Sequence, residues 1–567
     1  MTTLQDMVEP VLKKAGKGES LSRDEFLILL LDRIFLRASN SFFNGQFSYL
    51  PRAASGLKPG KILVILFSSI GDVVYSTPVI SALREKYPDS FISFLVEEDA
   101  YPVVEDNPYL DEVILLPFKD WQNRGGDLDR LLEELRHFTS DLKERRYDYL
   151  LNLHLSPRSA LITRLTCAKY VSGFGLREDG QPLVRGNLWN FYEYLIAIRP
   201  ETMKDYNRIN LAERSLRMAG LEPVHREAAF FLSREKEEKV KAILDELRID
   251  DDLLIGLNPG SNYPARRWLP ERFAGLADSL IREFGAKVII FGGPGDTEIA
   301  EGIIKTMEEE AINLAGKSSL WELAGIIKRC DHLITNDTGP MHIAGAVRTK
   351  VIAIDGPTRF GPYGGEGHLI LQTNLPCVGC GGMTTCDKGD CMRAIEVEDV
   401  LAALKYQRGE IPHSAFRIPH SDKVNVYTSG TSPPKRLFEY YPLMTYAPGQ
   451  ITNDLLRFGH INLWIQENNR LGFKEEPLSL EEVNKELTRR YGRKAFTEAA
   501  KYTQESIRLL KDYRQKPKDP RIDKFFGLFS ILFDQEVYSG QDFRKWKLSA
   551  SLFLENFLCA WVDTIKR

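Results

Sequence analysis

The feature that most constrains this chain is an alternation of short apolar runs with helical patterns, which starts at Lys61 and recurs in two separate series. In the first series the apolar run Ile62–Phe67 is followed by a short polar loop and then by a helical pattern over residues 73–86. A continuous apolar run of this length is typical of a strand buried on both faces, and strands that alternate with helices predict a parallel sheet. The other strands expected in this series are 91–96, 112–116 and 149–153.

A second series of the same kind begins near Asp250, and its expected strands are 253–257, 287–291, 332–335 and 351–354. The chain has 567 residues, more than one hydrophobic core accommodates, so at least two domains are expected. We therefore predict an α/β protein with two Rossmann-like lobes, residues 58–235 and 236–404. Paired lobes of this type bind their ligand between them, at the carboxyl ends of the strands.

Two regions flank these lobes, a helical preface over residues 1–57 and a mostly helical extension over residues 405–567. The most apolar stretch of the preface, residues 26–36, contains Asp32 and Arg33 and is shorter than the ~20 apolar residues that a membrane-spanning helix needs. We interpret it as a core helix, with a helix lying on a membrane surface as the alternative.

The C-terminal extension contains a Pro/Ser/Thr-rich stretch, residues 428–434, which we interpret as a linker. Further along, Ser479 and Glu482 have the spacing of a helix capping box. Neither feature carries chemistry, so the sequence assigns no role to this extension.

Composition excludes some classes of function. The formal net charge of -4 argues against a nucleic-acid-binding protein, which normally carries a basic stripe or a basic domain. The N-terminal residues lack the basic start and apolar run of a signal peptide, so we expect a cytoplasmic protein. Peripheral contact with the inner face of the cytoplasmic membrane is compatible with this expectation.

The first candidate site is the polar loop that follows the strand 62–67. Gly71 permits a tight turn there, and the carboxylate of Asp72 could accept the proton of an attacking hydroxyl as a general base. The alternative is that Asp72 only caps the helix that follows.

The second candidate site is the loop 258–270, at the start of the second series. Arg266 and Arg267 have forked guanidinium donors that match the oxygens of a diphosphate. The loop also holds two residues that can give neutral hydrogen bonds, Ser261 and Asn262. The alternative is a solvated basic pair beside a packed Trp268.

The third candidate site is the segment 335–346, which has the pattern of a strand, a tight turn and a helix. Backbone N–H groups at the helix N-terminus, together with Thr338 and His342, could bind pyrophosphate oxygens. Asp337 could hold sugar hydroxyls. The alternative is an ordinary turn in which Asp337 is a cap.

Four cysteines lie close together in the second series, at Cys377, Cys380, Cys386 and Cys391. The spacings of the outer pairs suit a tetrahedral thiolate site for zinc or iron, although the central spacer is short. Because disulfides are unusual in a reducing compartment, the alternatives are a metal site or free thiols. We favour a metal, which would be structural because four protein ligands leave no open position.

Taken together, the three loops resemble glycosyltransferase family 9, the ADP-heptose:lipopolysaccharide heptosyltransferases, over residues 61–404. The resemblance rests on Ser69-Ile-Gly-Asp-Val after the first strand, on Asn-Pro-Gly-Ser with Arg266-Arg267-Trp268, and on Asn336-Asp-Thr-Gly-Pro-Met-His342. It implies the GT-B fold, and an inverting transfer of a heptose from an ADP-heptose donor to a lipopolysaccharide core or another surface glycan, with no cofactor required for catalysis. It also implies that the first lobe binds the acceptor and the second lobe the donor.

The resemblance assigns roles to individual residues. Asp72 would be the general base, and Arg266, at a position that is often lysine in the family, would neutralise the departing diphosphate. Arg267 is a weaker candidate beside it. Other donor contacts would come from Ser261, Asn262, Asn313, Asp337, Thr338, Gly339 and His342. Arg158 lies where the family presents a basic residue to an anionic acceptor, and a four-cysteine cluster is frequent in the family.

Two other readings of the sequence remain open. A nucleotide-sugar epimerase or hydrolase with the same two lobes would act on the donor without an acceptor. Alternatively, the lobes could be a relic within a non-catalytic assembly protein, because the preface and the extension exceed a minimal family member.

Overall fold

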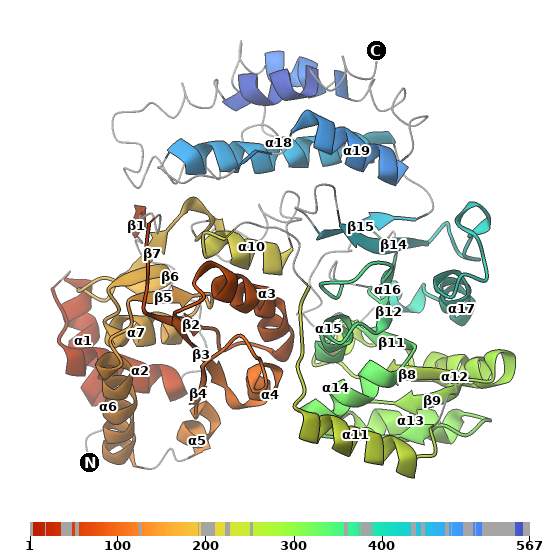
Figure 1. Ribbon diagram of the computed structural model, residues 1–567, viewed down its shortest axis with the longest axis horizontal. Helices are drawn as coiled ribbons and strands as arrows, with labels where there is room; N and C mark the ends of the chain where they lie inside the picture. The colour runs from red at the N-terminus through yellow and green to blue at the C-terminus, as the bar shows by residue number, and fades with distance from the viewer. Residues whose placement is uncertain are drawn as a thin grey trace.

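The chain forms two α/β lobes that lie side by side, with further helices across one end of both (Figure 1). The computed structural model describes residues 4–17, 19–35, 48–51, 56–123, 127–190, 192–193, 210–221, 227–249, 253–356, 361–373, 375, 386, 389–431, 438–443, 448–470, 476–477, 479–491, 503–504, 506–512 and 550–559.

The first lobe is built on a sheet for which the described residues supply seven strands, in the order β1-β7-β6-β5-β2-β3-β4. Neighbouring strands are parallel except for β6 and β7, which are antiparallel. The strands are β1 Ser48–Pro51, β2 Lys61–Ile65, β3 Phe91–Glu97, β4 Glu112–Leu116, β5 Tyr149–Asn152, β6 Tyr170–Leu176 and β7 Pro182–Gly186. The helices of this lobe are α3 Ile70–Lys86, α4 Tyr101–Val104, α5 Phe118–Asn123, α6 Leu128–Glu144, α7 Pro157–Thr166 and α10 Leu211–Met218.

The strands expected from the apolar runs of the first series are all present. Strand β1 lies in the stretch 1–57 that was expected to be helical, and it pairs with β7 at the edge of the sheet. A strand of four residues is too short to show the alternation of apolar and polar residues that identifies strands in a sequence. Its strand conformation is determined by pairing with β7, which lies far away in the sequence.

The preface also contains the helices α1 Leu4–Gly16 and α2 Arg23–Phe35. The apolar side chains of Phe26, Leu27, Leu29 and Leu30 are at most 2% exposed, and α2 packs against α6 and α7. Arg23 fastens the start of α2 to the lobe through a 2.9 Å hydrogen bond from its guanidinium to the carbonyl of Leu165. The prediction of a core helix in the preface is therefore confirmed.

The second lobe is built on a sheet with eight strands in the described part of the chain, ordered β10-β9-β8-β11-β12-β13-β14-β15. The strands are β8 Leu254–Asn258, β9 Lys287–Ile290, β10 Ile312–Asn313, β11 His332–Asn336, β12 Lys350–Ile354, β13 Leu369–Thr373, β14 Val424–Thr431 and β15 Phe438–Pro442. The helices are α11 Arg234–Glu246, α12 Pro270–Phe284, α13 Thr297–Thr306, α14 Leu320–Arg329, α15 Gly339–Ala346, α16 Asp390–Arg393 and α17 Val397–Gln407.

The first six strands of this order, from β10 through β9, β8, β11 and β12 to β13, are parallel to one another. Strand β14 is antiparallel to β13, and β15 is antiparallel to β14. The linker expected at residues 428–434 is wrong for its first half, because 428–431 belong to β14 and pair with β13 and β15. The polar composition of these residues suggested a linker. They form a strand because they pair with β13, whose edge would otherwise be unpaired. Residues 432–434 lie outside the described residues.

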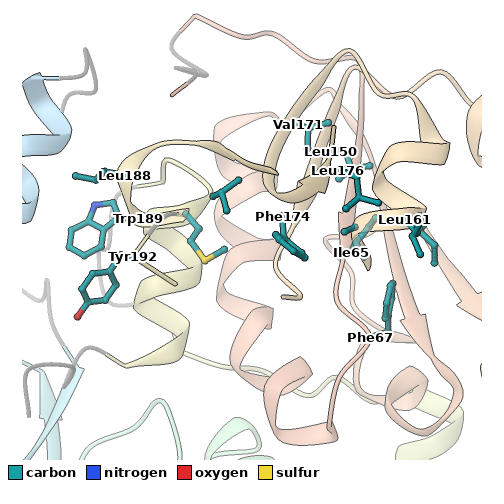
Figure 2. Close-up of a cluster of buried hydrophobic side chains, with 14 of the residues drawn as sticks. Ile65, Phe67, Leu150, Leu161, Val171, Phe174, Leu176, Leu188, Trp189 and Tyr192 are labelled. Atoms are coloured by element: carbon teal, nitrogen blue, oxygen red, sulfur yellow. The ribbon is translucent and has the colours of Figure 1, made fainter. Parts of the chain in front are cut away.

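The C-terminal helices α18 Pro448–Arg470 and α19 Leu480–Tyr491 lie across the top of Figure 1. Trp464 on α18 packs edge-on against Tyr192 of the first lobe at 4.9 Å, and Asn468 accepts a 3.0 Å hydrogen bond from the backbone N–H of Leu188. Figure 2 shows that Leu188, Trp189 and Tyr192 continue the apolar core of the first lobe. Helix α18 therefore packs as a layer on the first lobe, whereas β14 and β15, earlier in the same extension, belong to the sheet of the second lobe.

Two further expectations can be compared with the helices. The capping box at the start of α19 is confirmed: Ser479 accepts from the backbone N–H of Glu482, and the Glu482 carboxylate accepts from the backbone N–H of Ser479. Across the described residues, the helices lack the combination of length and apolar character that crossing a bilayer requires.

Candidate active site

The three predicted loops all lie at the carboxyl ends of central strands. The loop with Asp72 follows β2, the loop with Arg266 follows β8, and the turn with Asp337 follows β11. Strands β8 and β11 are direct neighbours in the second sheet, so their loops are adjacent. The fold brings the second and third loops together and places the first loop on the facing lobe.

Asp72 lies in the first turn of α3 and has a defined hydrogen-bonding arrangement. Its Oδ2 atom accepts hydrogen bonds from the hydroxyls of Ser68, at 2.6 Å, and Ser69, at 2.9 Å. Among the described residues, Oδ1 receives no hydrogen bond. The capping alternative is wrong, because Ser69 is the N-cap of α3 and its side chain faces the backbone N–H of Asp72. One carboxylate oxygen is thus held in place by two hydroxyls, and the other is available to a further hydrogen-bond donor.

The two lobes meet beside Asp72. A Cβ atom at Gly71 would lie only 2.6 Å from Cδ2 of His342, on α15 of the second lobe. The glycine is therefore required for the close approach of the two lobes, in addition to the tight turn for which the sequence suggested it.

His342 is 8% exposed, and in the described part of the chain its Nδ1 atom has no hydrogen-bond partner. Burial lowers the pKa of His342, and the nearby carboxylates of Asp337 and Asp72 only partly oppose this shift. The imidazole is accordingly neutral at pH 7 and retains a polar atom that a ligand can satisfy.

Arg266 and Asp337 form an ion pair across the second and third loops. The guanidinium donates from Nη1 to Oδ2 of Asp337 at 2.9 Å, and the two side chains are 17% and 7% exposed. Arg266 also stacks on the ring of Tyr263, at 4.6 Å from the ring centroid. The alternative of a solvated basic pair is therefore wrong for Arg266, which is fixed at the site and faces a carboxylate.

Two asparagines that the sequence analysis left without a role hold these loops together. Asn336 donates to the carbonyl of Pro259 at 2.7 Å and accepts from the backbone N–H of Trp268 at 3.0 Å. Asn258 donates to the Thr335 hydroxyl. Asn336 stands next to Asp337 in the motif already identified, and this position was the only signal from which its role could have been inferred.

The remaining residues that were predicted to bind the sugar donor fall into two groups. Ser261, Thr338 and Gly339 lie on the same two loops as the ion pair, and Thr338 is the N-cap of α15 without a capping hydrogen bond from its side chain. Asn262 is exposed, and Arg267 donates to the carbonyl of Ser261 at 2.8 Å. Asn313 lies apart, on the edge strand β10, with β9 and β8 between it and β11. Its side chain accepts from the backbone N–H of Ala315.

Arg158 lies in the first turn of α7, after β5, and is not an ordinary surface arginine. It donates to Glu97 at 2.9 Å and stacks over the ring of Phe118 at 3.9 Å. Both side chains are about a quarter exposed, and burial lowers the pKa of Arg158 and raises that of Glu97. No sequence motif links Arg158 to Glu97, because 61 positions separate the two residues.

His154, between β5 and α7, is a further residue that the sequence analysis missed. Its ring meets Phe67 edge-on at 5.1 Å. Burial and the charge of Arg158 lower its pKa to about 4, against the opposing effect of Asp72. His154 is thus a neutral, buried side chain that senses the charges of both Arg158 and Asp72.

A second buried ion pair lies near Asp72. Arg214 on α10 contacts Glu193 at 2.9 Å, with side-chain exposures of 8% and 17%. Burial raises the pKa of Glu193, and Asp72 adds to this effect while Arg214 opposes it. Neither residue belongs to a recognisable motif, so only the fold reveals their position.

The four-cysteine cluster lies partly outside the described residues, which include Cys386 and Cys391 but not Cys377 or Cys380. Cys386 is exposed and Cys391 is buried. In the portion of the chain that the structure describes, no group of three or more metal-ligating side chains is found. The proposed metal site stays a prediction.

Comparisons with known proteins identify the family of this chain. A sequence profile described as glycosyltransferase family 9 (heptosyltransferase) matches residues 135–387. Lipopolysaccharide heptosyltransferase 2 of Salmonella typhimurium is 29% identical over 310 residues, which cover 53% of this chain and 83% of that protein. Lipooligosaccharide heptosyltransferase 2 of Haemophilus influenzae is 30% identical over 311 residues, which cover 52% of this chain and 83% of that protein.

A solved structure shows the same architecture. The glycosyl transferase family 9 protein from Veillonella parvula has a TM-score of 0.52 and 26% identity, and the match covers 62% of this chain and 98% of that one. The profile match begins after Asp72 and includes Arg158 and the two loops of the second lobe. The chain belongs to glycosyltransferase family 9, the heptosyltransferase family, and is a glycosyltransferase with the GT-B fold.

Proposed function

We propose that this enzyme transfers a heptose from ADP-heptose to a lipopolysaccharide core or a related surface glycan, with inversion at the anomeric carbon. The related proteins of Salmonella typhimurium and Haemophilus influenzae are named as heptosyltransferases of lipopolysaccharide and lipooligosaccharide, respectively. The observation that carries the mechanism is the geometry of Asp72, whose Oδ2 is held by two serine hydroxyls while its Oδ1 is not hydrogen-bonded to a described residue.

In the proposed step, Asp72 accepts the proton of an acceptor hydroxyl as that oxygen attacks the anomeric carbon of the donor sugar. The new glycosidic bond forms on one face of the sugar while the bond to the β-phosphate breaks on the other. ADP leaves with the electron pair of the broken bond. A single displacement of this kind inverts the configuration at the anomeric carbon.

The second lobe would receive the leaving group. Arg266 supplies a positive charge, and the backbone N–H groups at the start of α15 add donors for phosphate oxygens, together with Thr338 and His342. Asp337 would accept hydrogen bonds from sugar hydroxyls. Ser261, Asn262 and Gly339 line the same loops, and Asn313 would contact the ribose at the far end of the donor.

The first lobe would bind the acceptor, with Arg158 facing an anionic group of the glycan. The donor is water-soluble, whereas a lipid-linked acceptor lies in a membrane leaflet. We therefore place the reaction in the cytoplasm, with the enzyme in peripheral contact with the inner face of the cytoplasmic membrane.

A donor panel that varies the base and the sugar, read by nucleoside-diphosphate release with and without a deacylated core glycan, tests this function. The proposal expects release that depends on acceptor and is fastest with ADP-heptose. Equal release without acceptor would instead indicate a hydrolase, and a change of the sugar without acceptor would indicate an epimerase. Proton magnetic resonance of the product shows whether the anomeric configuration is inverted.

A further inference from the structure

Tyr75 connects the helix of the proposed base to the opposite lobe. It lies on α3 three residues after Asp72, and residues with this spacing share one face of a helix. Its side chain is 5% exposed, and its hydroxyl donates a 2.6 Å hydrogen bond to the carbonyl of Gly361 in the second lobe. Tyr75 and Gly361 lie 286 positions apart in the sequence, and the hydrogen bond between them is buried.

The ring of Tyr75 also contacts the proposed anion site. Its centroid lies 4.7 Å from that of His342 and 6.1 Å from that of Tyr363. Burial, reinforced by the charges of Asp337 and Asp72, raises the pKa of Tyr75. The phenol therefore stays protonated at pH 7 and remains a donor.

The neighbouring carbonyl provides an internal comparison. Pro362, the residue after Gly361, accepts a 2.7 Å hydrogen bond from the hydroxyl of Tyr440 on β15. Tyr440 belongs to the second lobe, as Pro362 does, so this bond does not cross between lobes. Two tyrosines thus bind adjacent carbonyls of one segment, and the Tyr75 bond reaches it from the opposite lobe.

We propose that Tyr75 is a positioning residue that fastens the first lobe to the second and thereby sets the distance between Asp72 and the anion-binding end of α15. This inference rests on the proposed function for its kinetic consequences. The hydrogen bond from Tyr75 to the Gly361 carbonyl, which we call the latch, is a physical contact that does not depend on that function. Loss of the hydroxyl would leave the Gly361 carbonyl buried without this donor, and opening the lobes would relieve that cost by exposing the carbonyl to water.

The side chain has two separable parts. The hydroxyl makes the bond between lobes, whereas the ring supports His342. Tyr75→Phe removes only the first part, so it is expected to lower kcat about tenfold while changing the Kd for ADP less than twofold. Tyr75→Ala removes both and is expected to weaken ADP binding about tenfold as well.

Tyr440→Phe is the matched control, because it removes a hydrogen bond to the adjacent carbonyl within one lobe. It is expected to lower the Tm slightly and to leave kcat within twofold of the original value. The experiment measures kcat and KM for the donor, ADP affinity by calorimetry and Tm, together with the radius of gyration by small-angle X-ray scattering. Tyr75→Phe is expected to increase the radius of gyration in the absence of ADP, and Tyr440→Phe is not.

Equal effects of Tyr75→Phe and Tyr440→Phe on kcat, or an unchanged kcat and radius of gyration in Tyr75→Phe, would overturn the latch. If the original enzyme shows no transfer with any donor, the proposed function fails instead. The radii of gyration of the Tyr75→Phe and Tyr440→Phe variants then still show whether Tyr75 holds the two lobes together, because this measurement requires no catalysis.

Discussion

Asp72→Asn is the sharpest test of the proposed chemistry, because the structure separates the two oxygens of this carboxylate. The amide oxygen of asparagine can keep the hydrogen bonds from Ser68 and Ser69, at 2.6 and 2.9 Å. The NH2 group then occupies the position of Oδ1, where it donates hydrogen bonds and cannot take up a proton. The substitution therefore removes the base and preserves the shape of the loop.

The expected magnitudes follow from these contacts. A positioned general base contributes about 10²- to 10⁴-fold in rate, so kcat should fall by that factor, which corresponds to roughly 3–5 kcal/mol of barrier. Two charge-assisted hydrogen bonds become neutral ones, and a negative charge leaves the first turn of α3. Together these changes should reduce the free energy of unfolding by about 1–2 kcal/mol.

The assay measures ADP release with saturating donor and acceptor, ADP affinity by calorimetry, and stability by urea denaturation. ADP affinity should be retained, because the proposed donor contacts come from the second lobe. Asp127→Asn is the control, because Asp127 is a carboxylate at the start of another helix of the first lobe, α6, where it accepts from the backbone N–H of Arg130. A kcat within threefold of the original value in Asp72→Asn would refute the assignment of the base.

Three further outcomes are expected. Gly71→Ala should lower kcat/KM at least tenfold, because its Cβ would lie 2.6 Å from His342, whereas Gly275→Ala, with no atom within 4 Å, should not. Burial lowers the pKa of His368 to about 4. Between pH 6.5 and pH 4 the unfolded chain therefore binds a proton at this residue that the folded protein does not bind. Acidification over this range should lower the free energy of unfolding by about 3 kcal/mol. Urea denaturation of His368→Gln should show a smaller pH dependence than the original protein, whereas the exposed His137→Gln should not differ from it. Metal analysis of the enzyme purified without chelators should find about one zinc or iron, lost in Cys380→Ser; substantially less than one equivalent in the original protein would end the four-ligand proposal.

The sequence predicted those parts of the fold that depend on local patterns. The buried parallel strands read as uninterrupted apolar runs, and β2, β8 and β11 were located in this way. Because parallel strands of one sheet share an end, the loops that follow β8 and β11 were expected at the same end of the sheet, whereas their adjacency follows from the observed strand order. The same reasoning could not find β1, β14 or β15. These strands, of which β1 and β15 lie at sheet edges, are defined by the partners that they pair with, not by their own composition.

Contacts between distant segments were equally hidden. Glu97 and Arg158 lie 61 positions apart, and Tyr75 and Gly361 lie 286 positions apart. Each pairing depends on how the loops approach one another, and helical or strand periodicity contains no information on that approach. Residues of the candidate site that form recognisable motifs could therefore be singled out from the sequence, and the contacts that position them could not.

The ion pair between Arg266 and Asp337 affects which ligands the candidate site can bind. In this structure Arg266 is paired with Asp337, and both side chains are largely removed from water. A diphosphate alone would draw Arg266 away and leave a buried carboxylate without that partner, which is costly. A nucleotide sugar can compensate, because its hydroxyls can donate to Asp337 while its phosphates engage Arg266. We therefore expect an ADP-sugar to bind at least tenfold more tightly than ADP, and Asp337→Asn to reduce this ratio. Calorimetry of both ligands with both proteins measures it, and an unchanged ratio in Asp337→Asn would show that the carboxylate does not recognise the sugar.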